Sequence, residues 1–268
     1  MQGPQYQYTK ELYKRFGYVA TWTPATPVSL GDVGEMDGNV FRRVSSLKEM
    51  NVPFDIRKAS NKEDLIYTSE SGVNLNFKAA GSPIVEGSSL LVQKAGATID
   101  FHKGAGVVFV AKDCVSPSIE DQISLGKELI RRYNIGDWDA KYYVVTEVKQ
   151  AASMSAFISE SSGGKLELIA ENSLQLGTLS FADLNASFSV GASSGINTQI
   201  IAKEKLTPLF RVRQVKASFW SGTSFSVKEK SFHDLNELPP QAEITEENAE
   251  LVDFIPDFEN NWRNTSVI

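Results

Sequence analysis

Hydrophobic and polar residues alternate along four segments of the chain. Apolar side chains occupy every second position, and the positions between them hold mostly small polar residues. Because successive side chains of a β-strand point to opposite faces, each segment is predicted to be a strand with one apolar and one polar face. The apolar positions are Val73, Leu75, Phe77 and Ala79; Ala97, Ile99 and Phe101; Leu166 and Leu168; and Ala186, Phe188, Val190 and Ala192.

This alternation fits two kinds of structure. Antiparallel strands with one solvated face have the same period and are the more common case. The wall of a membrane β-barrel also has it, with apolar side chains facing lipid and polar side chains facing the lumen. A chain with four such segments could not close a barrel alone, so the second interpretation requires many subunits that each contribute hairpins to one ring.

Apolar positions at the helical period predict two helices. The first begins at Thr9, which can cap it, and ends at Phe16 before Gly17. The second covers about 117–133 and ends at an Asn-Ile-Gly-Asp turn. Both are amphipathic, so each is expected to lie on the outside of a larger sheet.

Three further stretches, 18–23, 141–148 and 209–216, are predicted strands because they are rich in β-branched and aromatic residues. Strands therefore dominate, and the helices are inserted without a regular alternation of strand and helix. This arrangement is typical of the α+β class.

The composition of the 268 residues, with 41% hydrophobic and 22% charged, is that of an ordinary soluble globular protein. No apolar run approaches the ~20 residues of a membrane-spanning helix, and the first residues are too polar for a secretory signal. We therefore expect the chain to be made in the cytoplasm. One cysteine and two histidines exclude a disulfide framework and a zinc site of Cys and His ligands, so we expect no metal and no cofactor.

Charge is distributed unevenly along the chain. Residues 231–268 hold nine of the 33 acidic residues and one of the 27 basic residues, which gives this stretch a net charge of −8. The remaining 1–230 then carry +2, within an overall charge of −6. An acidic C-terminal extension thus follows a slightly basic body, and the overall charge disfavours binding to nucleic acid.

The residues that could carry chemistry do not form a catalytic constellation. Gly104-Ala-Gly106 has no helix after it to receive a phosphate, and Ser161-Ser-Gly-Gly-Lys165 is interpreted as a hairpin turn. His102 lies on the polar face of a predicted strand, and Cys114 is expected to be an inert packed thiol. An enzyme is therefore not expected.

The order of these elements over nearly the whole chain resembles the bacterial gasdermins. The resemblance lies in the order and spacing of diffuse motifs, without a catalytic signature. They are Lys14-Arg-Phe-Gly-Tyr18 at the end of the first helix, the alternating segment 72–112, the helix near 117–133, the strand Lys141–Val148, the turn Glu160–Lys165 and the strand Phe210–Lys216.

The resemblance implies a twisted central antiparallel sheet with peripheral helices and a pore-forming role in cell death, which in bacteria serves abortive defence against phage. The expected pore-forming domain is 1–230, and 231–268 would be an acidic linker with an autoinhibitory peptide. Implied partners are an activating protease, membrane lipids and further copies of the chain. The protein would be cytoplasmic when autoinhibited and would move to the cell inner membrane after cleavage.

The family also implies a lipidated cysteine near the start of the chain. Here 1–6 reads Met-Gln-Gly-Pro-Gln-Tyr, so no lipidation is expected at this position.

The C-terminal extension contains large apolar residues, which we expect to dock on the body because solvating them all is unfavourable. They are Phe254, Ile255, Phe258 and Trp262. The polar stretch from Ser231 to Glu247 is the expected cleavage window. The alternative function is a soluble, non-catalytic β-rich binding or scaffold domain with an acidic tail that docks a partner. Liposome leakage after limited proteolysis would distinguish the two.

Overall fold

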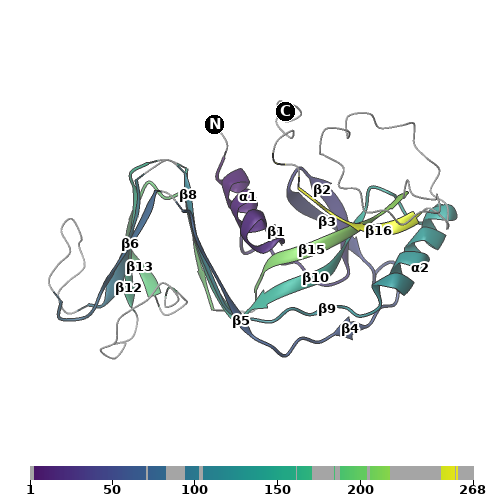
Figure 1. The fold of residues 1–268 in the computed structure, drawn as a ribbon, viewed down its shortest axis with the longest axis horizontal. Coiled ribbons are helices and arrows are strands. Elements are labelled where there is room, and N and C mark those ends of the chain that lie inside the picture. The colour runs from purple at the N-terminus through teal and green to yellow at the C-terminus, as the bar shows by residue number, and fades with distance from the viewer. Residues whose placement is uncertain are drawn as a thin grey trace, which may run out of the picture.

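The computed structural model consists of antiparallel sheets and two helices, which confirms the α+β class (Figure 1). A central eight-stranded sheet, sheet A, is followed by two four-stranded sheets, sheet B and sheet C, among the described residues. The structure describes residues 3–70, 72–82, 94–102, 105–160, 162–170, 184, 188–203, 206–217, 249–256 and 258.

Sheet A has the order β1-β15-β10-β2-β3, with three short strands beside this path. The path strands are β1 (Val19–Ala20), β15 (Leu206–Ala217), β10 (Tyr143–Ala151), β2 (Asp32–Asp37) and β3 (Val40–Ser46). Beside them, β16 (Ala249–Asp253) pairs with β15, while β4 (Ile56–Arg57) pairs with β9 (Ser118–Ile119), which also pairs with β10.

Sheets B and C form the two sides of an arch, and sheet A lies beyond sheet B (Figure 1). Sheet B has the order β14 (Thr198–Ala202), β11 (Ser153–Ser159), β8 (Gly106–Cys114) and β5 (Glu63–Thr68). Sheet C has the order β13 (Phe188–Ser194), β12 (Gly164–Ala170), β7 (Gly96–Phe101) and β6 (Val73–Lys78).

The first helix, α1 (Pro4–Phe16), begins five residues before the predicted start at Thr9. Gly3 is its N-cap and Pro4 its first residue, where the missing N–H of proline has no consequence. Thr9 lies inside the helix, and its hydroxyl donates to the carbonyl of Gln5 at 2.9 Å. The predicted end is confirmed, because Gly17 adopts the left-handed conformation with φ of 71°.

The second helix, α2 (Gln122–Asn134), starts later than predicted. Residues 118–119 form β9 instead, and Asp121 caps the helix by accepting from the Ser124 N–H at 2.9 Å. Ile123, which the period places on the apolar face, is 75% exposed. The predicted apolar stripe is thus wrong at this position.

The long predicted strands at 141–148 and 209–216 are confirmed as β10 and β15. The strand predicted at 18–23 is shorter, because only 19–20 pairs with β15.

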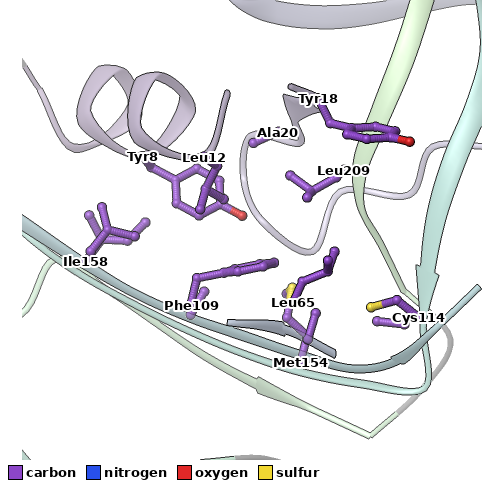
Figure 2. Packing of buried hydrophobic residues seen from close by; sticks show 14 residues of the cluster. Tyr8, Leu12, Tyr18, Ala20, Leu65, Phe109, Cys114, Met154, Ile158 and Leu209 are labelled. Atoms are coloured by element: carbon purple, nitrogen blue, oxygen red, sulfur yellow. The ribbon is translucent and has the colours of Figure 1, made fainter. Parts of the chain in front are cut away.

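Two hydrophobic cores occupy the two faces of sheet B. The α1 core lies between sheet B and α1, where Tyr8 and Leu12 point from the helix toward Phe109 and Met154 (Figure 2). The intersheet core lies between sheets B and C. Sheet B is therefore covered on both faces, whereas sheet C has an apolar face toward sheet B and exposed Asn74 and Asn76 on the other.

Candidate functional site

The four alternating segments form sheet C, and most of their apolar residues face sheet B. Ala97, Ile99, Phe101, Leu166, Leu168 and Phe188 are fully buried in the intersheet core. Val73, Leu75 and Phe77, on edge strand β6, are half-buried against the same core.

Three predicted positions differ from this pattern, and the structure does not describe a fourth. A bulge at Gly191 places Ala192 opposite Glu167, so Ala192 shares the face of Glu167 and not that of Phe188; the prediction for Ala192 is wrong in the folded chain. Val190 pairs with Leu168 and shares its face but is 43% exposed at the edge of the sheet. Ala79 is half-buried just beyond the end of β6, and Ala186 lies outside the described residues.

Each strand of sheet C is joined along the chain to the strand in the same position of sheet B. The pairs are β6 with β5, β7 with β8, β12 with β11 and β13 with β14, and the strand orders of the two sheets match pair by pair. Sheets B and C are therefore two halves of one four-stranded sheet that folds back on itself at an arch (Figure 1). We call sheets B and C together the fold-back sheet.

The two central strands keep one register through the arch. Phe101 pairs with Gly164 at the end of sheet C, and Gly106 pairs with Ser159 at the start of sheet B. The linking segments 102–105 and 160–163 are equal in length. The same register continues into sheet A through the bridge between Val115 and Gln150. Straightening the central pair would therefore require no change of partner.

The positions that face the intersheet core change at the arch. In each joined pair of strands they are odd-numbered on one side of the arch and even-numbered on the other. In β7, Ile99 and Phe101 face the intersheet core, but in β8 the residues of the same odd parity, Val107 and Phe109, face α1. Val108 and Val110 take the intersheet side in β8. The other three strand pairs behave in the same way.

If each pair were one straight strand, the alternation of side chains would collect these apolar residues on a single face. That face would combine residues from both cores. They are Leu65, Tyr67, Val73, Leu75 and Phe77; Ala97, Ile99, Phe101, Val107, Phe109 and Ala111; Met154, Ala156, Ile158, Leu166, Leu168 and Ala170; and Phe188, Val190 and Ile200.

The sheet B members of this face escape detection from the sequence. Val107-Val-Phe-Val-Ala111 is a continuous apolar run without alternation, since both faces of β8 are buried in the folded chain.

Hydrogen bonds connect α1 to the arch. The Ser69 hydroxyl donates to the Glu11 carboxylate at 2.6 Å and accepts from the Val107 N–H at 2.8 Å. Glu11 belongs to α1, Ser69 follows β5, and Val107 belongs to β8. Burial raises the pKa of Glu11 above its ordinary value, against the opposing effects of hydrogen bonds and of Lys10.

A second polar cluster lies where sheet B meets sheet A. The Lys149 ammonium on β10 contacts the Glu63 carboxylate of β5 and lies 2.7 Å from the Ser116 hydroxyl. It also lies 4.9 Å from the ring centre of Tyr18. These contacts join the first strand of the fold-back sheet to sheet A and to the segment that follows α1.

The C-terminal extension docks on the body as a strand. β16 pairs with β15 along five register pairs from Arg213–Asp253 to Ala217–Ala249. Leu251 packs on α2 at Gly126, and the Asp253 carboxylate accepts from the Arg213 guanidinium at 2.8 Å. The sequence alone does not single out Leu251, which lies between Glu250 and Val252 in a mostly acidic stretch.

The predicted apolar residues of the extension behave differently from one another. Phe254 is half-buried edge-on to Tyr143, with ring centres 5.5 Å apart. Phe258 contacts Tyr6 and Tyr13 of α1, with ring centres 5.7 and 6.0 Å apart. Ile255 is 68% exposed, so the expectation that it docks is wrong. Trp262, the domain boundary at 230 and the cleavage window Ser231 to Glu247 lie outside the described residues.

These contacts place α1 between the extension and the fold-back sheet. Tyr6 and Tyr13 contact Phe258, while Tyr8 and Leu12 lie in the α1 core against sheet B. Movement of the extension would therefore change the packing of the helix that covers the outer face of sheet B.

The side chains that could act as nucleophiles, bases or metal ligands do not lie together. His102 is exposed at the end of β7, and burial raises the pKa of the Cys114 thiol to about 12, so it is not a thiolate at neutral pH. Across the part of the chain that the structure describes, no group of three or more His, Cys, Asp or Glu side chains is placed to hold a metal ion.

A scan against protein-family models found no match, and a search of curated proteins found none either. Within the described ranges, neither helix is long and apolar enough to cross a membrane.

Proposed function

We propose that this protein is an autoinhibited pore-forming cell-death effector of the gasdermin kind. Proteolytic removal of the C-terminal extension releases the folded-back strands, which straighten and insert into a membrane as hairpins of a large ring of identical subunits. The protein is cytoplasmic before cleavage and acts at the cell inner membrane afterwards.

The observation that carries this proposal is the pairing of sheets B and C strand by strand, with one apolar face divided between two cores. Soluble domains can have sheets that are covered on both faces, but they do not require one face of a strand to be divided between two cores. A strand that must later face lipid along its length does need it. The other face of the straightened strands would include Asn74, Asn76, Asp100 and Lys165 in its sheet C half, as a water-filled lumen requires. Its sheet B half would include Val108, Val110 and Phe157.

The lengths of the joined strands agree with this role. Glu63 to Lys78 holds 16 residues, and the other three joined strands are of similar or greater length. A membrane-spanning strand needs ~9 to 11 residues, so each would cross the bilayer and still extend beyond it.

The extension supports the proposal as an inhibitory element. It occupies the edge of β15 and contacts α1, which covers the outer face of sheet B. Its removal would also change the net charge from −6 to +2 if the cut fell at 230, and anionic lipid attracts basic surface.

The direct test is dye release from anionic liposomes before and after cleavage. A specific protease site would be engineered between Pro240 and Glu247, inside the expected cleavage window. We expect uncut protein to be inert and cut protein to release dye and form large oligomers. Cut protein that stays monomeric and inert on several lipid mixtures would contradict the proposal and favour the binding-domain alternative.

Straightening can be tested separately with a disulfide across the arch. A Cβ added at Gly106 of β8 would lie 2.9 Å from a Val73 methyl carbon of β6, so Val73→Cys with Gly106→Cys places two thiols close together. The same Cβ would lie 2.8 Å from the Phe101 ring, which must shift in both variants that carry Gly106→Cys. In a straight hairpin Val73 stays opposite Phe101, and position 106 lies about 17 Å further along, beyond the reach of a disulfide.

We expect the cut, oxidised double variant to be inert and the same protein after reduction to release dye. Each single cysteine variant, treated identically, is the control and should release dye in both states. Equal leakage from the oxidised and reduced double variant would show that the arch does not open.

A further inference from the structure

The C-terminal extension is held in a site with the features of a peptide-binding groove. Residues 218–248 separate β15 from β16 in the sequence, so the bound strand and the edge that it occupies are joined through a long connection. The site lies on four elements, namely α2, β15, β10 and α1.

We propose that this groove recognises residues 249–258 as a separate chain, by strand addition, after the connection is cut. The occupant is the severed C-terminal segment itself. This inference rests on the proposed function and adds to it that cleavage alone does not empty the site. The segment must dissociate before the pore can form, and free segment rebinds and inhibits.

The backbone of the groove is an open strand edge that the segment completes. One edge of β15 pairs with β10, and its other edge is shared between β1 at 209–210 and β16 at 213–217. The Phe254 N–H extends the ladder by donating to the Val212 carbonyl at 3.0 Å. Without the segment these β15 groups would be unpaired, and such an edge binds an extended peptide through main-chain hydrogen bonds.

A recess on α2 selects the side chain at position 251. Gly126 lies in the middle of α2, where glycine costs about 1 kcal/mol of helix stability relative to alanine. A Cβ at this position would come within 3.2 Å of two Leu251 side-chain carbons. The absence of a side chain at Gly126 therefore makes room for Leu251.

An ion pair and an aromatic contact bind the rest of the segment. Arg213 forms the ion pair with Asp253, and Tyr143 packs edge-on against Phe254. The groove thus favours an acidic extended peptide with an aliphatic residue two positions before an aspartate and an aromatic residue directly after it.

The test uses the full chain with the protease site between Pro240 and Glu247, cut in solution without membranes. A fluorescently labelled peptide of residues 249–268 is added, and its anisotropy is followed as it exchanges with the severed segment. We expect saturable binding that unlabelled peptide reverses. In parallel, excess peptide is expected to slow dye release from anionic liposomes by at least tenfold.

Gly126→Leu is the sharpest variant, because the new side chain fills the recess that Leu251 occupies. Leucine is also a better helix former than glycine, so loss of α2 is not the expected effect. We expect peptide affinity to fall by about tenfold or more, the equivalent of losing one buried aliphatic contact. Lys127→Ala, on an exposed position of the same helix, is the matched control and should bind as the parent does.

Asp253→Ala in the peptide is expected to weaken binding by only about two- to fivefold, because the ion pair is partly exposed. Unchanged affinity in Gly126→Leu, checked for a normal thermal transition, would overturn the inference. So would leakage that excess peptide does not slow. Peptide binding with no leakage on any vesicle would support the groove and overturn the proposed function instead.

Discussion

Sheets B and C are made from the same four strands but have different environments. Sheet C has one apolar face, toward sheet B, and a second face with exposed asparagines. Sheet B is apolar on both faces, because α1 covers the side that sheet C does not. Side chains of one parity in a strand thus lie against sheet B in the half that belongs to sheet C, and against α1 in the half that belongs to sheet B.

The difference indicates which parts of the molecule hold the arch closed. The apolar face of sheet C is covered by sheet B alone. Sheet B has two apolar faces, of which sheet C covers one and α1 covers the other. Release of the strands would therefore require two separations, sheet C from sheet B and α1 from sheet B. Only the second involves the C-terminal extension, through Phe258 on α1.

The largest effect is expected from a large-to-small change in sheet B. Phe109 is completely buried against Tyr8 and Phe16 of α1, so Phe109→Ala should lower the free energy of unfolding by about 3–5 kcal/mol. Phe77→Ala, at a half-buried site on β6 of sheet C, should cost less than about 2 kcal/mol. Urea denaturation measures both, and equal losses would mean that the two sheets are not packed differently.

The next effect separates the folded state from the membrane state. Val190 is exposed on sheet C, so Val190→Asp should change folding stability by no more than about 0.5 kcal/mol. On the lipid face of a straight strand, the charge would cost free energy in each subunit, less than the ~2–4 kcal/mol of a Lys or Arg at the bilayer centre, and the cost is repeated in every subunit of the ring, so leakage after cleavage should be lost.

Ser189→Asp is the matched control for this prediction, since Ser189 pairs with Ile169 on the opposite face and would line the lumen. It should leak as the parent protein does. If Val190→Asp also leaks normally, the assignment of the apolar face to lipid is wrong.

The sequence reveals sheet C more clearly than sheet B for a physical reason. A strand with one solvated face alternates, and residues such as Asn74 and Asn76 mark that face directly. β8 is buried on both faces, so its apolar run has no period and does not indicate which side belongs to which core. The fold-back could not be predicted, because it depends on the register between strands that lie far apart in sequence.

The C-terminal site was predictable only in part. Aromatic residues in an acidic stretch indicate docking, and Phe254 and Phe258 do contact the body. The recess at Gly126 depends on where α2 lies relative to β16, which sequence periodicity does not contain. For the same reason, Ile255 is no different from Phe254 in the sequence but is exposed in the structure.

A smaller effect concerns the interface between α1 and sheet B. Within the described residues, the hydroxyl of fully buried Tyr8 has no hydrogen-bond partner, and burial raises its pKa. An unpaired buried hydroxyl is unfavourable, so Tyr8→Phe should raise the free energy of unfolding by about 1 kcal/mol and slow leakage after cleavage. Tyr18→Phe is the control, because the Tyr18 hydroxyl donates to Glu147, and its removal should instead lower stability. Destabilisation by Tyr8→Phe would show that this hydroxyl does have a partner.

The smallest effect is a dependence on pH at the contact between α1 and the arch. Burial raises the pKa of Glu11 above the ordinary 4.5, so the folded state binds this proton more tightly than the unfolded state does. The free energy of unfolding should therefore fall as the pH rises from 4.5 through the raised pKa, and level off above it. Lys10 lowers the pKa of Glu11 and reduces the size of the effect, and Lys14, Arg15 and Glu70 line the same cavity of about 540 Å³.

Glu11→Gln keeps an oxygen that can accept from Ser69 and removes the titration, so it should stabilise the protein slightly at pH 7.5 and make no difference near pH 4. Glu49→Gln, in the turn that follows β3 of sheet A, is a control of opposite sign. The Ser46 hydroxyl lowers the pKa of Glu49, so its contribution is present above pH 4.5 and is lost as the pH falls. Denaturation of both variants at the two pH values measures this, and a loss of stability in Glu11→Gln at pH 7.5 would mean that the ionised carboxylate strengthens the contact between α1 and the arch.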